Sequence, residues 1–311
     1  MVLSHRRRSI LLKPEATYGT DSVPVAADAL LTSNLRIRPL DGQYVNRELV
    51  DGQLGIKPEA LSNVGAGVEF GIEAGGGGAA GTAPTWGKVL LACGYAETVN
   101  AGTSVEYNLV SSAYGSATIK AHVGGDEGHI QTMTGVRGSA GFTADANALP
   151  LFNVNMQGLF TAPAKVAPQA TDYSAHQLPP RVEPPNVTVF TLGGETLCFA
   201  QFSIEDSRSL QLNRYANCPE VSVGDRAITG RAVVSMPALD AKDLIAEARA
   251  ETLQALAMTI GTEAGNILSL AAPAVQIKLE GYQDNQGDLD VTLGLNFTPD
   301  QGDDEISWTV T

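Results

Sequence analysis

The sequence contains few of the residues that carry most enzyme and metal chemistry. Among 311 residues there are four histidines and three cysteines. The cysteines, Cys93, Cys198 and Cys218, are odd in number and form no CxxC pair, which argues against a disulfide framework or a cysteine-ligated zinc site. We expect them to be reduced, small core residues of a protein made in the cytoplasm.

Basic residues are also scarce. The chain has 20 lysines and arginines against 34 aspartates and glutamates, which gives a formal net charge of -14. The only basic cluster is Arg6, Arg7 and Arg8. A protein that grips phosphate groups needs a basic surface that displaces counterions. The composition therefore argues against tight nucleic-acid binding and fits a surface that repels DNA.

Long apolar runs are missing as well. The N-terminal "SILL" is shorter than the apolar core of a signal peptide and ends at Lys13, and no run approaches the length of a membrane span. We expect a soluble protein without a cleaved leader and without a membrane partner. With 43% hydrophobic and 17% charged residues, the composition is that of a globular protein with one large domain or two.

What the sequence does contain is a repeated β pattern. Segments of alternating apolar and polar residues, such as "GVEFGIEA" at 67–74, predict strands through most of the chain. A proline-rich stretch at 162–187 predicts an extended linker. It divides the chain into an extended N-terminal arm at 1–33, a first β domain at 34–161 and a second β domain at 188–311. The predicted fold class is mainly β, with two tandem sandwich or barrel domains.

Each predicted domain also carries one helical pattern and one charged, glycine-marked hairpin. In "TWGKVLLACG" Thr85 is placed to cap a short helix and Gly94 to end it. In "LDAKDLIAEARAETL" Asp240 is placed to cap a second helix, with Leu244 and Ile245 on one face. We expect one short flanking helix and one long hairpin in each domain.

The order of strand, hairpin, strand, helix and β-meander occurs in both halves. Moving the chain by 137 residues places "HVGGDEGHI", which starts at His122, on "TIGTEAGNI". Gly124 then matches Gly261, and Gly128 matches Gly265. The same shift places "NVNMQGLFT" on "DVTLGLNFT" without a gap. We therefore predict a structural duplication of one β domain.

The stretch "HVGGDEGHI" is also the strongest candidate for chemistry. His122, Asp126, Glu127 and His129 could bind zinc, but structural zinc sites use closely spaced pairs and catalytic sites need a third protein ligand. The second copy has threonine and asparagine at the histidine positions. We interpret the stretch as a turn between two strands. A phosphate loop is disfavoured too, because these glycines lie between strands and "GGGG" at 75–78 lacks the GK[ST] ending.

No arrangement of side chains points to catalysis. There is no GxSxG nucleophile elbow, and the four histidines lie in the arm, a turn or the linker. Asp303, Asp304 and Glu305 are interpreted as a solvated turn before the last strand. We predict no catalytic, cofactor-binding or metal-binding residue and no cofactor, so we expect that the protein is not an enzyme.

One segment resembles a known family. In "LLKPEATYGTDSVPVAADALLTSNLRI" the pattern K-x-E-x-x-Y-G-T-D resembles the start of major tail tube proteins of long, non-contractile-tailed bacteriophages. Its positions are Lys13, Glu15, Tyr18, Gly19, Thr20 and Asp21. "RAITGRAVVSMPA", the second helical pattern and "APAVQI" are similar to the same family's domain pattern.

The resemblance implies a fold, a function and partners. Tail tube proteins are small β-sandwiches or barrels whose rings close through a continuous inner β-barrel and stack into a hollow tube that conducts the genome. It thus implies a structural protein of the virion tail, assembled in the host bacterial cytoplasm. The implied partners are further copies of the chain, the tape measure protein, the tail terminator and the distal tail proteins. The acidic composition predicts a lumen that repels DNA, which passes without specific binding.

The predicted duplication bears on the ring. If each half is one tube domain, three chains make a trimer with pseudo-sixfold symmetry; if one half is decoration, the ring is a hexamer. We favour the trimer. The alternative function is a β-rich binding or decoration module of a virion that does not polymerise.

Contacts between rings are expected from three segments that look unnecessary for a sandwich core. These are the arm and the charged hairpins at 46–56 and 213–223. Alternation with a period of two residues does not tell which face of a sheet points inward, so the lumen residues stay unassigned by the sequence.

Overall fold

The computed structural model describes residues 3–50, 52, 54–214 and 218–311. Strands dominate the described chain, and all of their pairings are antiparallel. The mainly β fold class is confirmed. No helix among the described residues is long and apolar enough to cross a membrane.

The described residues of the first half form nine strands, one α-helix and two short 3-10 helices. They are β1 (Ser4–Pro14), η1 (Ala26–Asp28), β2 (Ala29–Leu30), β3 (Thr32–Val45), β4 (Ala60–Glu73), α1 (Gly87–Ala92), β5 (Tyr95–Asn100), β6 (Ser104–Leu109), β7 (Ala117–Gly124), η2 (Gly125–Glu127), β8 (His129–Asp145) and β9 (Leu151–Leu159).

In the second half, ten strands and one helix occur among the residues that the structure describes. They are β10 (Val187–Leu192), β11 (Glu195–Thr196), β12 (Phe199–Asp206), β13 (Leu210–Arg214), β14 (Pro219–Val223), β15 (Ile228–Ser235), α2 (Leu244–Arg249), β16 (Leu253–Ile260), β17 (Leu268–Asn285), β18 (Asp288–Thr298) and β19 (Ser307–Val310).

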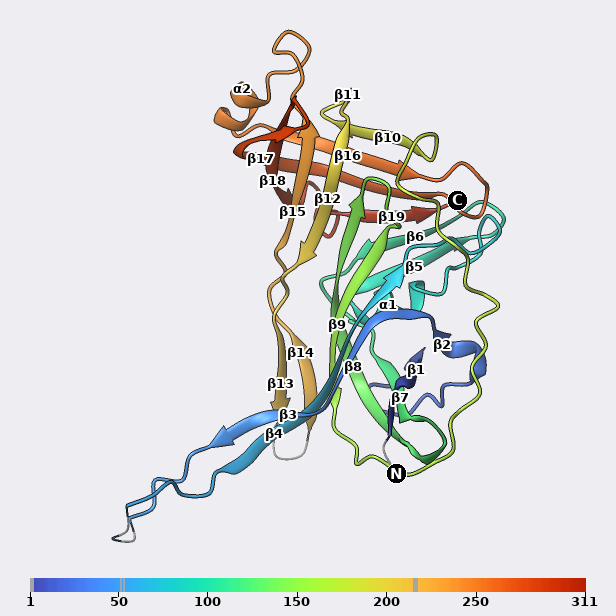
Figure 1. The fold of residues 1–311 in the computed structure, drawn as a ribbon, viewed down its shortest axis with the longest axis vertical. Coiled ribbons are helices and arrows are strands. Elements are labelled where there is room, and N and C mark those ends of the chain that lie inside the picture. The colour runs from blue at the N-terminus through green and yellow to red at the C-terminus, as the bar shows by residue number, and fades with distance from the viewer. Residues whose placement is uncertain (1–2, 51, 53, 215–217) are drawn as a thin grey trace.

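The two halves pair their strands in the same order. In the first half the order of neighbours is β3, β4, β9, β8, β7, β1. In the second half it is β12, β15, β18, β17, β16, β10. The end of β8 pairs with β12, so the strands join in one seventeen-stranded sheet, with β13 and β14 as a separate hairpin (Figure 1).

Most of the buried apolar side chains of the described residues belong to one cluster that draws on both halves. Trp308 of β19 lies with its ring centroid 4.7 Å from that of Phe142 and 5.1 Å from that of Phe152. Trp86 also packs against Phe152, with 4.8 Å between the ring centroids. The C-terminal strand also pairs with β6, so the end of the chain is built into the first half.

The N-terminal arm is more firmly attached than the sequence indicates. Strand β1 pairs with β7 and β2, and Ile10 and Leu12 are fully buried in the core. Leu30, near the end of the predicted arm, is buried there as well. The prediction that the arm is not needed for the core is therefore wrong for these residues, because the apolar run "SILL" supplies core side chains.

Both helices form, but neither predicted cap is used. Helix α1 begins after Trp86 without a side-chain cap, and Thr85 contacts His176 instead. Gly94 adopts φ +76° just after the helix, as its predicted role at the end requires. Helix α2 is capped by Asp243, which accepts from the Ala246 amide at 2.9 Å, so the prediction of Asp240 is wrong. The helix is also shorter than its pattern, and Ile245 is exposed while Leu244 is buried.

The proline-rich stretch lies along the outside of the sheet. Ala164 forms an isolated bridge to Ile130, and the amide of Asp172 donates to the Ala26 carbonyl at 2.9 Å. Val182 is buried, and its amide donates to the Ala148 carbonyl. The stretch is extended chain with few pairings, held down at separate points.

The three cysteines are free, but only one is a core residue. Cys93 is buried, and burial raises the pKa of its thiol to about 12. Cys198 and Cys218 are exposed. The expectation that all three are core residues is therefore wrong for these two.

Candidate assembly surface

One face of the sheet is largely polar over eight strands, and the hairpin of β13 and β14 lies against part of it on β4, β8 and β9. Its opposite face carries the core, and alternate residues of β3, β4, β9, β8, β12, β15, β18 and β17 point away from it. The polar face comprises Ser33, Arg36, Arg38, Glu69, Gly71, Asn153, Asn155, Gln157, Ser139, Gly141, Thr143, Gln201, Ser203, Glu205, Thr229, Arg231, Gly294, Asn296, Gln276, Lys278 and Glu280. Two apolar residues lie on the same side, Leu151 opposite Thr143 and Val233 opposite Gln201.

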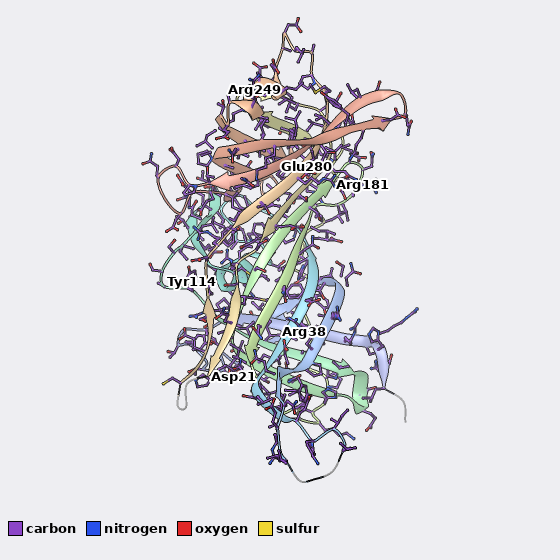
Figure 2. The ribbon with its side chains drawn as sticks, turned by 90° about the vertical axis from the view of Figure 1, so that its left-hand side faces the viewer. Asp21, Arg38, Tyr114, Arg181, Arg249 and Glu280 are labelled. Atoms are coloured by element: carbon purple, nitrogen blue, oxygen red, sulfur yellow. The ribbon has the colours of Figure 1, made fainter. Side chains whose placement is uncertain are left out.

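The charges of the polar face are mixed and partly paired. Arg38 lies 3.4 Å from Glu69 and donates to the Asn155 amide oxygen at 2.9 Å. Arg231 lies 3.3 Å from Glu280. Figure 2 labels Arg38 in the lower half of the molecule and Glu280 in the upper half, so a similar pair occurs at each end. The acidic excess of the chain is therefore not concentrated on this face.

The hairpin formed by β13 and β14 is docked against the first half of the chain. Leu212 and Val221 are buried, and Leu212 lies close to Gly65 of β4. Arg137 of β8 donates to the Val221 carbonyl at 2.7 Å and to Glu220 at 2.8 Å. The apolar side of this hairpin is thus covered within the monomer.

Tyr18 of the arm also binds this hairpin. Its hydroxyl accepts a hydrogen bond from the Val221 amide at 2.6 Å, and the Arg137 guanidinium lies 4.6 Å from the ring centroid. Burial raises the pKa of the Tyr18 hydroxyl, although the Val221 amide and Arg137 act in the opposite direction. Tyr18 therefore stays a neutral phenol at ordinary pH.

Glu15, another position of the K-x-E-x-x-Y-G-T-D pattern, organises the loop that presents Tyr18. Its carboxylate accepts from the Gly19 and Gly135 amides at 2.8 and 2.9 Å. It also accepts from the hydroxyls of Ser116 and Thr118, at 2.7 and 2.8 Å. The pattern therefore joins the arm to β7, β8 and, through Tyr18, to the docked hairpin.

The outer half of the hairpin formed by β3 and β4 has no such support. Beyond Gly65 the two strands pair only with each other within the described chain, and the hairpin projects from the body (Figure 1). Its exposed apolar residues are Tyr44, Val45, Leu49, Val50, Leu54, Ile56 and Leu61. Val50, Leu54 and Ile56 are as exposed as in an extended chain, at 100%, 105% and 99%. A monomer rarely presents such a group of apolar side chains unless another molecule covers them.

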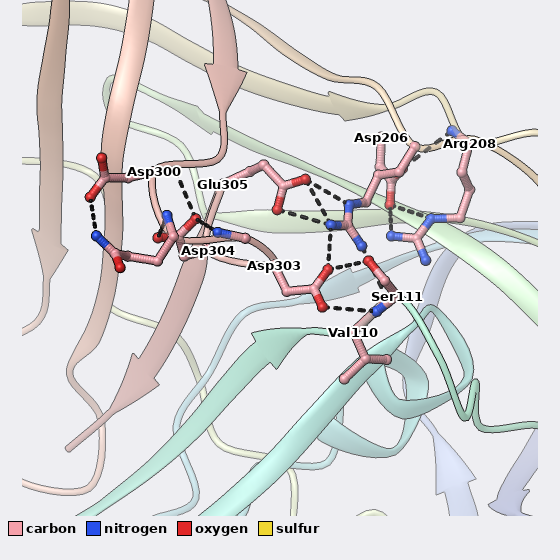
Figure 3. A network of polar contacts seen from close by, with 11 residues as sticks. Val110, Ser111, Asp206, Arg208, Asp300, Asp303, Asp304 and Glu305 are labelled. Atoms are coloured by element: carbon pink, nitrogen blue, oxygen red, sulfur yellow. Dashed lines mark hydrogen bonds and ion pairs between the residues drawn. The ribbon is translucent and has the colours of Figure 1, made fainter.

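A polar network closes the base of the docked hairpin (Figure 3). Arg226, between β14 and β15, donates to Glu305 at 2.7 Å, to Asp303 at 3.0 Å and to the Val110 carbonyl at 3.1 Å. Ser111 also donates to Asp303, and these two donors hold the pKa of Asp303 below its ordinary value. Glu305 is buried, so the prediction of a merely solvated turn is wrong for Asp303 and Glu305.

The stretch at 122–130 forms a turn and brings no ligand set together. His122 is buried and bonds through Nε2 to the Gly125 carbonyl at 3.0 Å. Asp126 accepts from Arg7, and Glu127 pairs with Lys165 at 2.6 Å. No group of three or more potential metal ligands occurs among the described residues.

The matched glycines of that stretch are only partly equivalent. Gly124 and Gly261 both adopt a left-handed backbone, with φ of +100° and +111°. Gly265 has φ +85°, whereas Gly128 has φ -78° and is required for a different reason: a Cβ there would lie 1.9 Å from the Val123 carbonyl oxygen.

The three segments expected to contact other rings differ in accessibility. The hairpin at 46–56 is exposed where it is described, and residues 51 and 53 lie outside the described chain. Most of the arm and the described end of the hairpin at 213–223 are built into the monomer, and residues 1, 2 and 215–217 are not described. Sequence reasoning missed Glu15, Arg137 and Arg226 as organising residues, because their partners lie far away in the chain.

Comparison with known protein families matches residues 6–306 to a family model described as phage tail tube protein. No curated protein matches the chain.

Proposed function

Because the chain belongs to the phage tail tube protein family, we propose that its copies close into rings and that these rings stack into the tail tube of a phage with a long, non-contractile tail. Membership makes it a structural, self-assembling protein of the virion tail and not an enzyme. The finer proposal follows the K-x-E-x-x-Y-G-T-D pattern and includes assembly in the host bacterial cytoplasm.

The observation that carries the proposal is the repeated order of strand pairing. Each half contributes four strands to the polar face, β3, β4, β9 and β8 from one half and β12, β15, β18 and β17 from the other. The repetition supports two tandem tube domains, at 34–161 and 188–311, each with one short helix. On this basis three chains supply six equivalent units, and the ring is a trimer with pseudo-sixfold symmetry.

The polar face is the best candidate for the wall of the channel. It is continuous across both halves, and asparagine, glutamine, serine, threonine and glycine make up most of it. Its four basic residues, Arg36, Arg38, Arg231 and Lys278, are balanced by the acidic Glu69, Glu205 and Glu280. We therefore modify the expectation of an acidic lumen: the wall is hydrophilic and close to neutral, so it offers DNA neither a basic surface to bind nor an apolar one.

Contacts beyond the monomer fall first to the hairpin at 44–61, because its described apolar side chains are exposed. The docked hairpin and the buried part of the arm contribute indirectly, by fixing the shape of the subunit. The tape measure protein inside the channel, and the tail terminator and distal tail proteins at its two ends, are the further partners of this proposal.

Electron cryo-microscopy of concentrated purified protein, combined with native mass spectrometry of released rings, tests the proposal. We expect hollow tubes whose rings contain three chains. Rings of six chains with strict sixfold symmetry would retain the tube but remove the duplication. Dispersed particles at all concentrations would support the non-polymerising binding or decoration module instead.

A further inference from the structure

The sheet ends in two strand edges that have no partner strand within the described chain. Strand β3 pairs only with β4. Strand β17 pairs on one side with β18, while on its other side β16 reaches only as far as Gln276. Pro39 interrupts the free edge of β3, because it has no N–H to give to a further strand and its carbonyl accepts from the Gln131 side chain at 2.7 Å. Unpaired edges of this kind are ready to pair with another chain.

The joint between the two halves shows how such edges can meet. Strand β8 pairs on one side with β7 through its first part and with β12 through its last residues, Phe142 to Asp145. In that joint Thr143 lies opposite Ser203. The Ala146 amide also donates to the Ala200 carbonyl at 2.9 Å, so this carbonyl points toward β8.

The position of β17 that corresponds to Thr143 follows from the pairing. Thr143 lies opposite Leu151, the first residue of β9. The shift that matches Gly124 with Gly261 also matches Leu151 with Asp288, the first residue of β18. Asp288 lies opposite Asn285, which therefore occupies the place of Thr143.

The position of β3 that corresponds to Ser203 follows in the same way. Ser203 lies opposite Arg231 of β15, which lies opposite Gly294 of β18. In the first half, Gln157 is the residue matched with Gly294, and from Gln157 the pairing leads through Gly67 to Arg38. Arg38 therefore occupies the place of Ser203.

We propose that the end of β17 in one copy pairs antiparallel with β3 of the next copy, with Asn285 opposite Arg38, and that this pairing closes the ring. This inference rests on the proposed function. It identifies the strand pairing that joins neighbouring copies into a ring. Each ring then alternates an internal joint of β8 with β12 and an external joint of β17 with β3, which makes the polar face continuous around the channel.

Charge complementarity favours this partner. A groove of about 530 Å³ beside β3 is lined by His5, Arg6, Arg8, Thr32, Asn34 and Leu35. Arg36 adds a side chain that is 74% exposed. The end of the hairpin of β17 and β18 carries exposed Asp284 and Asp288, and Gln286 and Gly287 form its tight turn with positive φ. The acidic end of one copy thus fits the basic groove of the next.

One detail of the free edge matches the internal joint. The Leu35 carbonyl corresponds to that of Ala200, and in the monomer it accepts from the Arg8 guanidinium at 2.7 Å. A charged side chain from the arm therefore occupies the carbonyl that a neighbouring strand would use. Such cover is a common way to protect an exposed strand edge before assembly.

Disulfide trapping tests the register. The full chain carries Arg38→Cys and Asn285→Cys in a background with Cys198→Ser and Cys218→Ser, and is assembled and then oxidised with oxidised glutathione. Residues that face each other on paired strands have Cα atoms close enough for a disulfide, roughly 4.4 to 6.8 Å. We expect a covalent ladder on a non-reducing gel that ends at the closed ring. The control pair, Arg38→Cys with Leu253→Cys, uses another exposed strand residue and is expected to stay monomeric.

The outcomes separate the joint from the function. Tubes without a disulfide between positions 38 and 285, or with equal trapping in the control pair, overturn the joint while leaving the tube intact. Failure of the unsubstituted chain to form rings or tubes overturns both.

Charge reversal provides a second test of the pairing between β17 and β3, and it does not require cysteine chemistry. Arg36→Glu is expected to raise the concentration needed for assembly about tenfold, which corresponds to about 1.4 kcal/mol, and Asp288→Arg is expected to act similarly. Combining both changes is expected to restore assembly. Arg231→Glu is the matched control, because it places the same change on the same face in a central strand, with a side chain that is 53% exposed. Equal defects in Arg36→Glu and Arg231→Glu would overturn the inference.

Discussion

The two long hairpins of this subunit start from corresponding places in the sheet and end in opposite environments. The hairpin of β13 and β14 lies against β4, β8 and β9, with Leu212 and Val221 buried. The outer half of β3 and β4 projects freely, with Val50 and Leu54 fully exposed. The difference is one of available neighbours: the first half of the chain stands beside the second hairpin, whereas in the described chain no further strand pairs with the outer part of the first.

This contrast suggests how the exposed hairpin behaves in the assembly. If copies follow one another in a ring as the two halves do within the chain, the free hairpin meets the second half of a neighbouring copy. The docked hairpin then serves as an internal example of the contact that the free one makes. Changes to the free hairpin should affect assembly, and changes under the docked hairpin should affect folding.

The largest expected effect comes from trimming the free hairpin. Replacing residues 44–61 with Asn-Gly is expected to leave the melting temperature nearly unchanged and to abolish tubes, because the described residues of this segment supply no buried side chain to the core. Calorimetry and negative-stain microscopy measure the two properties. Val50→Ser with Leu54→Ser is a milder version, in which the loss of about 1.5 kcal/mol or more of burial per side chain raises the assembly concentration at least tenfold. Normal tubes from the trimmed chain would show that the free hairpin is not needed for assembly.

Arg137→Met is the corresponding change beneath the docked hairpin. It removes the charged hydrogen bonds to Glu220 and the Val221 carbonyl as well as the contact with the Tyr18 ring. We expect the free energy of unfolding to fall by about 2 kcal/mol, measured by urea denaturation. Arg36→Met, at an exposed arginine, serves as control and should change stability by less than about 0.5 kcal/mol. A similar loss of unfolding free energy in both variants would show that the contacts of Arg137 beneath the docked hairpin do not cause the loss.

Tyr18→Phe sharpens the same comparison at a single atom. The change removes the hydroxyl that accepts from the Val221 amide and leaves the ring beneath Arg137. We expect a loss of about 1 kcal/mol in unfolding free energy, together with faster amide hydrogen exchange at Val221. Tyr44→Phe on the free hairpin should alter neither quantity. Unchanged exchange at Val221 would mean that the hydroxyl does not hold the hairpin.

The smallest expected effect concerns pH. The pKa of Asp303 is lowered in the folded state by the hydroxyl of Ser111 and by Arg226 at the base of the docked hairpin. Its stabilising contribution is therefore fully present above its unfolded pKa of about 4, and is lost as the pH falls through the lowered folded value. Asp303→Asn should reduce the difference in melting temperature between pH 6 and pH 3. An unaltered difference would exclude Asp303 as a contributor to acid sensitivity.

The sequence predicted the β content, the two helix positions and the turn at Gly124, because these depend on local alternation, glycine and short periodic runs. It did not predict that Ile10 and Leu12 are core residues, since "SILL" is too short to indicate burial. The motif at Lys13 to Asp21 was noticed, but the actions of Glu15 and Tyr18 depend on partners as distant as Gly135 and Val221. Local sequence patterns do not indicate contacts between residues so far apart in the chain.

The pairing of β8 with β12 also has a kinetic consequence. This joint forms between segments of one chain, so it needs no encounter between separate molecules and does not depend on protein concentration. A ring built from such subunits loses translational freedom at half as many joints as a ring of single-domain subunits with the same circumference. In the proposed trimer, each copy arrives with one of its two joints already made, and dilution acts only on the other.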